Sequence, residues 1–595
     1  MPAPIRSAIN RRPSVVLVTA SGCPGQISNF MPDNGLATLA AILKQAGISV
    51  RVLDFNTLSH MKKYITPELQ QELVQTMQRV FDLTKDGIPK LGKGLATLGF
   101  LARKLQHIER KMIALRPRVN AELAAEIADT VREREATLVG FKTFHGPGSS
   151  GPIEMALNLR QQFPDLLLAA GGPQASLFNR RILDLNLDQG AFDVIAAGGD
   201  GEAMIVSLAE ASVGKPLTEV PGIYYCDEDG AVKMTDPRVI EDLNMIPAAD
   251  YGADVYPAMH LPGNEKMWIL VVEDAKGCSH GCPFCTHGTI WGKVRRQRSV
   301  TKIVDEMEMA VKKYGVRAFR LAGSSAPNRF LRELSAEIIR RDLKIKWTTF
   351  ARTDIDSSIF PQLKESGCVS IFFGVESGDQ DVLDGMGKRV TVEQIKRTIK
   401  DCNAAGIKAV GSIIHPAPFS TPETETKNFE LVRESDLRYV LSQFTGLFPG
   451  TPYAANPGKY GIKIKYPSRL LNVLARAGLI SPANYYDPVI QEYLFGYEMK
   501  RLAKPPSWEP TPWEYDYGFG LRGFSHYAKV TDRFQMKMRA QGRLYLTDEE
   551  LLMADMAGHE PGVFGAESTI AVRSVDIDAT RELLQKINQG NSQIG

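Results

Sequence analysis

Three cysteines stand close together near the middle of the chain, in the stretch EDAKGCSHGCPFCTHG. They are Cys278, Cys282 and Cys285, three of the seven cysteines in a chain of 595 residues. Thiolates this close together on one loop can bind a common centre. Structural zinc normally takes four ligands, often from two separate pairs, and no second cysteine or histidine pair follows here. A zinc site completed by His280 or His287 stays open as an alternative.

An iron–sulfur centre fits three thiols better than zinc does. Such clusters usually take four cysteines. When only three hold a four-iron cluster, one iron keeps a position free of protein ligands and can bind a small molecule. Gly277, Gly281 and Pro283 favour a tight loop whose backbone wraps a bulky inorganic centre. These residues therefore indicate a four-iron cluster with one open iron.

Several motifs in and after the cysteine loop resemble one known family. The CxxxCxxC spacing, with the aromatic Phe284 before the last cysteine, resembles the radical S-adenosylmethionine (SAM) superfamily. Four segments follow in the order expected of that family: RRQRS at 295–299, RLAGSSAPN at 320–328, FARTDI at 350–355 and GVESGDQDVLDGMGKR at 374–389. One departure is GSS at 323–325, where many relatives carry an acidic DD segment.

This resemblance implies cofactors and the residues that bind them. It implies a 4Fe–4S cluster on the three cysteines and SAM chelated at the open iron, where one electron yields methionine and a 5′-deoxyadenosyl radical. The residues implied to bind SAM are Phe284, Gly323, Ser324, Arg352, Glu376 and Ser377. Two alternatives stay open: Glu376 as a barrel salt-bridge residue, and Arg352 as a partner of Asp354 or Asp356.

The pattern of strands and helices predicts an α/β chain with three main parts. Residues 1–215 alternate apolar runs with helical patterns, which predicts a Rossmann-like (flavodoxin-like) domain with a helical insertion at about 57–135. A linker at 216–262 contains a hairpin, and residues 263–455 carry six strand–helix repeats that predict a partial (β/α)6 radical SAM barrel. Residues 456–595 are expected to form a mainly helical C-terminal domain, a candidate for substrate binding.

The first domain resembles the cobalamin-binding domain that is fused to one branch of the superfamily. This likeness rests on the order of SVVLVTA, GLATLAAILKQAG, GGPQAS and GGDGE. The DxHxxG motif of classical cobalamin enzymes is absent, as is common in that branch. The residues implied to bind cobalamin are Gln26, Thr143, His145, Gly171, Gly172, Gln174, Gly198, Gly199, Gly201 and Glu202. The alternatives are ordinary turns for the glycines and a surface or structural role for His145.

Late barrel loops and one aromatic segment supply candidates for a substrate pocket. They are His415, Tyr453, Trp508 and Trp513. The two tryptophans stand in a proline-rich stretch, for which packing onto the barrel is the alternative. No catalytic residue can be assigned from the sequence.

Composition narrows the class of protein and its surroundings. The net charge is only +3, which gives no basic field for nucleic acid, and no apolar run is long enough to span a bilayer. The basic N-terminus precedes an apolar run so short that it indicates a first strand rather than a signal peptide. We therefore expect a cytoplasmic protein without disulfides, with neither nucleic acid nor membrane as a partner.

The function implied is that of a cobalamin-dependent radical SAM methyltransferase, similar to the class B methylases of secondary-metabolite pathways. It would move a methyl group from SAM via methylcobalamin to an unactivated centre of a natural-product intermediate or a peptide. An external one-electron reductant of the flavodoxin or ferredoxin type would supply the electron. The alternatives are an oxidative cyclase or rearrangement enzyme with both cofactors, a radical enzyme with a degenerate first domain, and a non-catalytic cobalamin or cluster sensor.

Overall fold

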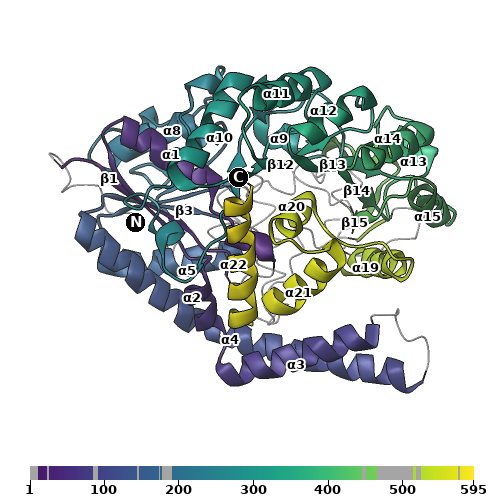
Figure 1. The fold of residues 1–595 in the computed structure, drawn as a ribbon. Helices are drawn as coiled ribbons and strands as arrows, with labels where there is room; N and C mark the ends of the chain where they lie inside the picture. Colours follow the sequence, from purple (N-terminus) through teal and green to yellow (C-terminus); the bar gives the residue numbers. More distant parts are fainter. Residues whose placement is uncertain are drawn as a thin grey trace.

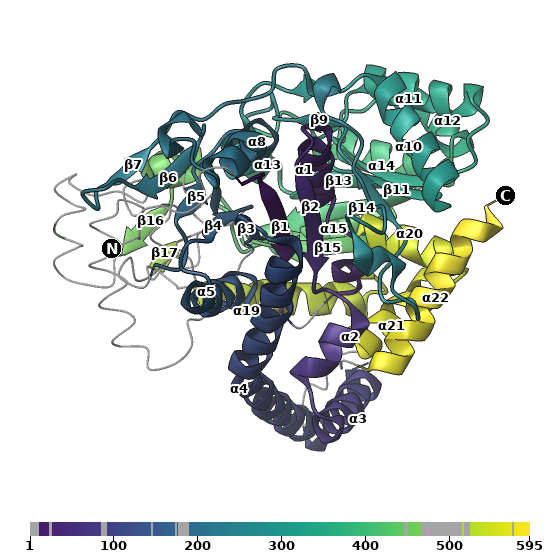
Figure 2. The ribbon, with the colours of Figure 1, turned by 90° about the vertical axis from the view of Figure 1, so that its left-hand side faces the viewer.

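Two largely parallel sheets lie side by side, each flanked by helices, and the C-terminal helices pack beneath them (Figure 1). The computed structural model describes residues 11–22, 26–84, 92–143, 147–172, 175–176, 190–444, 450–465, 473, 514–516, 524–573 and 576–594. Figure 2 shows the molecule turned so that the N-terminal sheet faces the viewer.

The N-terminal sheet has the strand order of a flavodoxin-like fold. Its five parallel strands run in the order β2-β1-β3-β4-β5. They span Ser14–Thr19 (β1), Ser49–Asp54 (β2), Leu138–Lys142 (β3), Leu167–Gly171 (β4) and Val194–Ala196 (β5). The strands are mostly buried and rich in Val and Leu, because helices cover both faces.

A hairpin extends this sheet into the stretch that the sequence assigns to a linker. Strands β6 (Ile223–Cys226) and β7 (Val232–Met234) are antiparallel, and β6 pairs with β5. The Asp227 carboxylate fixes the turn, because its Oδ1 accepts the backbone N–H groups of Asp229 and Ala231. The sheet therefore continues past residue 215, and the linker proper begins after β7.

Helices cover the two faces of the sheet in pairs. Helices α1 (Asn34–Gln45) and α8 (Gly201–Ala211) pack on one face with Val15 and Leu17. On the other face, α4 (Lys93–Arg134) and α5 (Pro147–Gln162) pack with Val16. The N-terminus of α1 is capped by Asp33, whose side chain accepts the Leu36 N–H.

The predicted helical insertion contains the short α2 (Leu58–Met61) and the long helices α3 (Pro67–Thr84) and α4 (Lys93–Arg134). Helix α3 packs against part of α4 at the foot of Figure 1. Helix α4 contains Pro117, which removes one backbone hydrogen bond from its interior. After this proline α4 joins the core of the N-terminal sheet through residues such as Leu123. One helix thus links the insertion to that sheet.

The predicted partial barrel is present as six parallel strands. They run in the order β8-β11-β12-β13-β14-β15. Their bounds are Leu270–Val272, Ala318–Leu321, Lys346–Ala351, Cys368–Glu376, Lys408–Ile414 and Tyr439–Gln443. The main covering helices are α10 (Val300–Tyr314), α11 (Asn328–Arg340), α12 (Phe360–Glu365), α14 (Val392–Ala404) and α15 (Thr424–Glu434). The predicted fold class is therefore confirmed.

The C-terminal part is mainly helical where the structure describes it. Its helices are α19 (Phe524–Ala540), α20 (Asp548–Met556), α21 (Pro561–Arg573) and α22 (Ile577–Gln593). Helix α20 packs on the sheet face that the barrel helices leave open, where buried Asp548 accepts a hydrogen bond of 2.9 Å from the Thr348 hydroxyl and pairs with Arg320 at 3.3 Å. The C-terminal helices thus close the inner face of the partial barrel.

Candidate functional site

A short antiparallel ribbon closes the loop that carries the three cysteines. Strands β9 (Ala275–Lys276) and β10 (Arg296–Gln297) pair, and residues 277–295 form the loop between them. Gly277 is required at its start, because a Cβ there would lie 2.0 Å from the carbonyl oxygen of Val294. The Cys278 N–H donates to the carbonyl of Gly292 at 3.1 Å, which folds the loop back on itself.

The three cysteines predicted to hold the cluster all lie on this loop. Cys278, Cys282 and Cys285 are all partly exposed and form no disulfide. Burial raises the pKa of the Cys282 and Cys285 thiols, and iron coordination would overcome this by deprotonating them. Within the described ranges, no three His, Cys, Asp or Glu side chains are grouped around a point that a single metal ion could occupy.

The GSS segment is held against the cysteine loop by a buried ion pair that the sequence analysis missed. Asp274 pairs with Arg295 at 2.8 Å and accepts the Gly323 N–H at 2.6 Å. Arg295 also donates to the Ser324 hydroxyl at 2.7 Å, and that hydroxyl donates to the carbonyl of Gly277 at 2.8 Å. Gly323 and Ser324 thus lie beside the loop although the acidic DD segment is absent.

Glu376 stands at the carboxyl end of β13 in an unusual backbone conformation. Its φ is 67°, and the pairing of β13 with β14 shifts register between Gly374 and Glu376. The buried carboxylate pairs with Lys388 at 2.7 Å and accepts a 3.4 Å hydrogen bond from the Ser412 hydroxyl. Strained backbone concentrates at functional sites, so this position suits a ligand contact. The ion pair itself matches the salt-bridge alternative, and the SAM contact stays a prediction.

The other residues predicted to bind SAM have partners within the protein. Arg352 pairs with Asp354 at 3.1 Å and donates to the carbonyl of Lys388 at 2.6 Å. Ser377 is fully buried, and its hydroxyl donates to the Asn428 side chain at 3.2 Å. The Phe284 ring lies 6.3 Å from the ring of Tyr453. Their roles toward SAM stay predictions.

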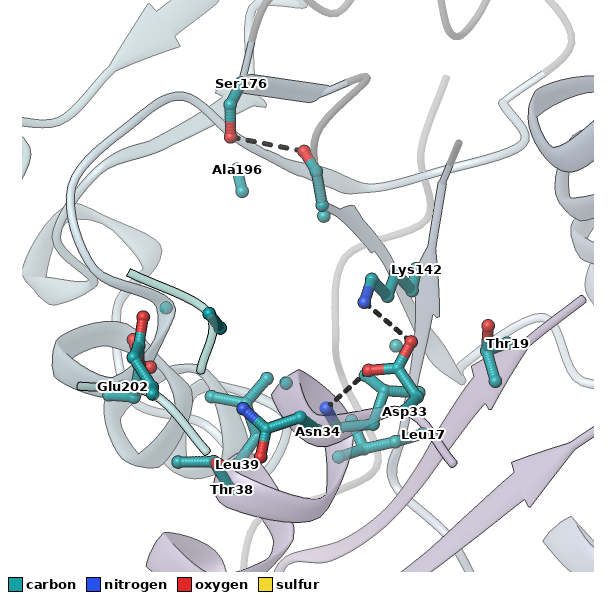
Figure 3. Close-up of a pocket in the computed structure, with 18 of the residues that line it drawn as sticks. Leu17, Thr19, Asp33, Asn34, Thr38, Leu39, Lys142, Ser176, Ala196 and Glu202 are labelled. Carbon is teal, nitrogen blue, oxygen red and sulfur yellow. Dashed lines mark hydrogen bonds and ion pairs between the residues drawn. The ribbon is translucent and has the colours of Figure 1, made fainter. Parts of the chain in front are cut away.

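A cavity of about 960 Å³ lies between the two sheets, at the carboxyl edge of β1, β3, β4 and β5 (Figure 3). This edge is where open α/β sheets bind ligands. Seven of the predicted cobalamin residues line it: Gln26, Gly171, Gly172, Gly198, Gly199, Gly201 and Glu202. The barrel side contributes Val271, Glu273, Lys276, His287 and Trp291. The cavity therefore touches both the N-terminal sheet and the surroundings of the cysteine loop.

Of the three remaining predicted cobalamin residues, the structure describes only Thr143. Thr143 is fully buried, and its hydroxyl donates to the carbonyl of Gly171 at 2.8 Å, so it supports the wall without lining it. His145 and Gln174 lie outside the described residues.

Polar side chains that the sequence analysis missed line the N-terminal wall. Lys142 pairs with Asp33 at 2.6 Å, and Figure 3 shows this pair beside the cavity, with Asn34 and Thr38 on the neighbouring helix. Two signals in the sequence could have found them. Asp33 precedes a helical pattern as an N-cap, and Lys142 is a charged residue at the end of a buried strand.

The structure describes two of the four residues predicted for the substrate pocket. His415 is buried, with its Nε2 3.5 Å from the Glu425 carboxylate, and burial lowers its pKa. Tyr453 is fully buried, and its N–H donates to the carbonyl of Pro283 at 3.1 Å, which places it against the cysteine loop. Trp508 and Trp513 lie outside the described residues.

Comparison with known proteins identifies the class of the barrel. Residues 272–430 match the profile of the Radical SAM superfamily. The chain thus carries a radical SAM domain, whose cofactors are a 4Fe–4S cluster and SAM, and the predicted resemblance is confirmed. This match supports the prediction of an enzyme.

Individual relatives match part of the chain. The uncharacterized methyltransferase PH0819 of Pyrococcus horikoshii is 28% identical over 42% of this chain and 55% of its own length. The anaerobic magnesium-protoporphyrin IX monomethyl ester cyclase of Rubrivivax gelatinosus is 30% identical over 46% of this chain and 49% of its own length. The chain therefore spans about half the length of these curated relatives.

A solved structure matches nearly the whole chain. The radical SAM methyltransferase TsrM from Kitasatospora setae, with cobalamin and a 4Fe–4S cluster bound, superposes with a TM-score of 0.62 at 16% identity. The match covers 97% of this chain and 100% of TsrM, so the two proteins share a fold.

Among the residues described here, no helix is both long and apolar enough to cross a membrane.

Proposed function

We propose that this enzyme is a cobalamin-dependent methyltransferase that moves a methyl group from SAM via methylcobalamin to an unactivated centre of a natural-product intermediate or a peptide. The cavity between the sheets carries this proposal. One wall is the carboxyl edge of a flavodoxin-like sheet, and the other includes β8 and residues that flank the cysteine loop. A methyl carrier and a radical source that act on one substrate need such neighbouring sites. The fold shared with TsrM supports it.

The residues present fit these groups. Cys278, Cys282 and Cys285 would hold the cluster, and the wall with Lys142 and Asp33 would hold the corrinoid. When bound, the cluster with SAM supplies a 5′-deoxyadenosyl radical, and the corrinoid supplies a methyl carrier.

The protein's own part is to bind, orient and exclude water. Asn34 and Thr38, together with the Lys142–Asp33 pair, offer hydrogen-bond donors and acceptors to the amide-bearing rim of a corrinoid. Val271 and Ala322 give the barrel wall apolar surface that keeps water from the reacting centre.

A second candidate function keeps both cofactors but transfers no methyl group. One relative, 30% identical over 46% of this chain, is named a cyclase, which favours an oxidative cyclisation or a rearrangement as the alternative. The mass of the product separates the two functions. Methyl transfer adds one methylene unit, and oxidative cyclisation removes hydrogen.

The partners proposed are a small-molecule or peptide substrate and a one-electron reductant of the flavodoxin or ferredoxin type. Because SAM cleavage in this superfamily needs an electron from the cluster, each turnover that makes the radical requires that donor. A cytoplasmic location is part of the same proposal, since a reducing compartment protects free thiols.

The test begins with anaerobic reconstitution of the full chain with iron, sulfide and hydroxocobalamin, followed by desalting. The proposal expects a complete cluster and one corrinoid per chain. After reduction, SAM labelled in its methyl group should place the label on the bound corrinoid and then in the product. A cluster without corrinoid, or a product without label, would refute methyl transfer.

A further inference from the structure

A buried seam of charges joins the wall of the cavity to the ribbon that closes the cysteine loop. Asp200 pairs with Arg296 at 2.5 Å and lies 3.5 Å from Lys276, and Glu202 pairs with Lys276 at 2.7 Å. None of these four side chains is more than 10% exposed. Buried charges are stable only when they are paired, so the two sides of the seam hold each other in place.

The two cations stand at the two ends of the cysteine loop. Lys276 belongs to β9 and precedes Cys278 by two residues, and Arg296 belongs to β10. All three cysteines lie on the loop between these strands. The position of the ribbon therefore sets the position of the thiols.

The two carboxylates stand on the wall proposed to hold the corrinoid. Asp200 is the N-cap residue of α8, and Glu202 is in its first turn. Both belong to the GGDGE segment, in which Gly198, Gly199 and Gly201 also line the cavity. A ligand that presses on this segment acts directly on the anions of the seam.

The Asp200 carboxylate is held on several sides. Besides Arg296 and Lys276, it accepts the N–H of Ile240 at 2.7 Å. Arg296 in turn donates to the carbonyl of Ile240 at 2.7 Å, and the Lys276 ammonium lies 5.1 Å from the centre of the Trp291 ring. This many fixed partners make Asp200 the centre of the seam.

We propose that Asp200 is a positioning residue that couples the corrinoid site to the cluster loop. Through Arg296 and Lys276 it fixes the ribbon, so that a corrinoid bound against the GGDGE segment and a cluster bound on the cysteine loop favour each other. This inference rests on the proposed function, because it takes the cavity as the corrinoid site. Coupling between two sites is reciprocal, and an effect of about 5–150-fold is typical.

The experiment measures the affinity of the full-length chain for hydroxocobalamin with and without the reconstituted cluster. In the wild type, the cluster should raise the affinity at least about 5-fold. Asp200→Asn should bring the ratio of the affinities with and without the cluster close to one. Asp193→Asn is the matched control. It breaks the 2.5 Å pair between Asp193, which directly precedes β5, and Arg160 on α5, neither of which belongs to the ribbon, and it should keep the wild-type ratio.

A second pair of variants covers the case in which Asp200→Asn does not fold. Lys276→Gln should lower the ratio, and Lys276→Arg should restore it, because arginine keeps the charge that faces Glu202. Two results would overturn the coupling and leave the proposed function standing. The first is an equal hydroxocobalamin affinity with and without the cluster in the wild type. The second is a wild-type ratio of these two affinities in Asp200→Asn or Lys276→Gln. Failure of either form to bind hydroxocobalamin would instead refute the proposed function.

Discussion

The predicted barrel site and the cavity wall of the N-terminal sheet consist of different kinds of residue. The predicted barrel site depends on side chains with distinctive chemistry, namely three thiols and a buried Glu376–Lys388 pair. The N-terminal wall depends on glycines and on ordinary polar residues such as Asn34 and Thr38. A site made of rare side chains can be recognised in a sequence, whereas a site made of backbone and common side chains can be recognised only once the chain is folded.

The largest expected effect is on the barrel side of this comparison. Replacement of Cys278, Cys282 or Cys285 with alanine should abolish the cluster, because each removes one of only three thiolate ligands. Iron and sulfide per chain after anaerobic reconstitution measure this loss. Cys226→Ala is the control, because this half-buried cysteine stands on β6 and should leave the iron content unchanged. A cluster retained in the loop variants would refute the assignment.

The next effect concerns the buried ion pair at the end of β13. Glu376→Gln leaves the Lys388 ammonium buried without a countercharge, which costs about 3–5 kcal/mol. The double variant Glu376→Gln/Lys388→Met should recover most of that stability, because it removes the unpaired charge. If Glu376 contacts SAM, both variants should bind SAM at least about 10-fold more weakly than the wild type. Urea unfolding measures the stability, and equilibrium dialysis measures the SAM affinity.

The exposed pair Glu393–Lys396 supplies the control for Glu376. Because the Glu393 side chain is 81% exposed, Glu393→Gln should cost less than about 1 kcal/mol. A Glu376→Gln protein that unfolds at the wild-type urea concentration would show that its pair is not buried in solution.

Two neighbouring glycines test the N-terminal wall. Gly172 has a φ of 98°, and a Cβ there would lie 3.0 Å from the carbonyl oxygen of Thr143, so Gly172→Ala should destabilise the fold by about 1–3 kcal/mol. At Gly171 the nearest atom to a Cβ is 3.8 Å away, so Gly171→Ala should fold normally. If a corrinoid approaches this backbone closely, Gly171→Ala should lower hydroxocobalamin affinity about 10-fold. An unchanged affinity would remove Gly171 from the site.

The smallest effect is a pH dependence that arises between the two regions. Burial, reinforced by Glu202 and Asp274 and opposed by Lys276 and Arg298, raises the pKa of Glu273 to about 7. Above pH ~4.5 the unfolded chain releases a proton that the folded chain keeps up to pH ~7, so stability should fall as the pH rises through this window. Because the Glu273 side chain is 23% exposed, we expect the free energy of unfolding to fall by only about 1 kcal/mol over this window.

Urea midpoints between pH ~5 and ~8, for wild type and Glu273→Gln, measure that dependence. The variant has no carboxyl group at this position, so its midpoint should vary less over the window. An identical profile for the two proteins would mean that Glu273 titrates normally.

The fold could be predicted further than the site. The six barrel strands and the five parallel strands of the first sheet are short apolar runs that end in turns, and local patterns predict such elements. The position of α20 against Thr348 could not be predicted, because it depends on packing between residues far apart in the sequence. The same holds for the pairs of Asp200 with Arg296 and of Asp33 with Lys142.

The most direct test of the account is electron paramagnetic resonance of the full chain loaded with both the cluster and a corrinoid and reduced anaerobically. The corrinoid is proposed to bind in the cavity, and the cluster on the neighbouring cysteine loop, which contributes His287, Ile290 and Trp291 to the barrel side of that cavity. We therefore predict that the signals of the reduced cluster and of cob(II)alamin broaden or split each other through dipolar coupling. Two unperturbed signals, each identical to that of the chain carrying one cofactor, would contradict neighbouring sites for the two cofactors.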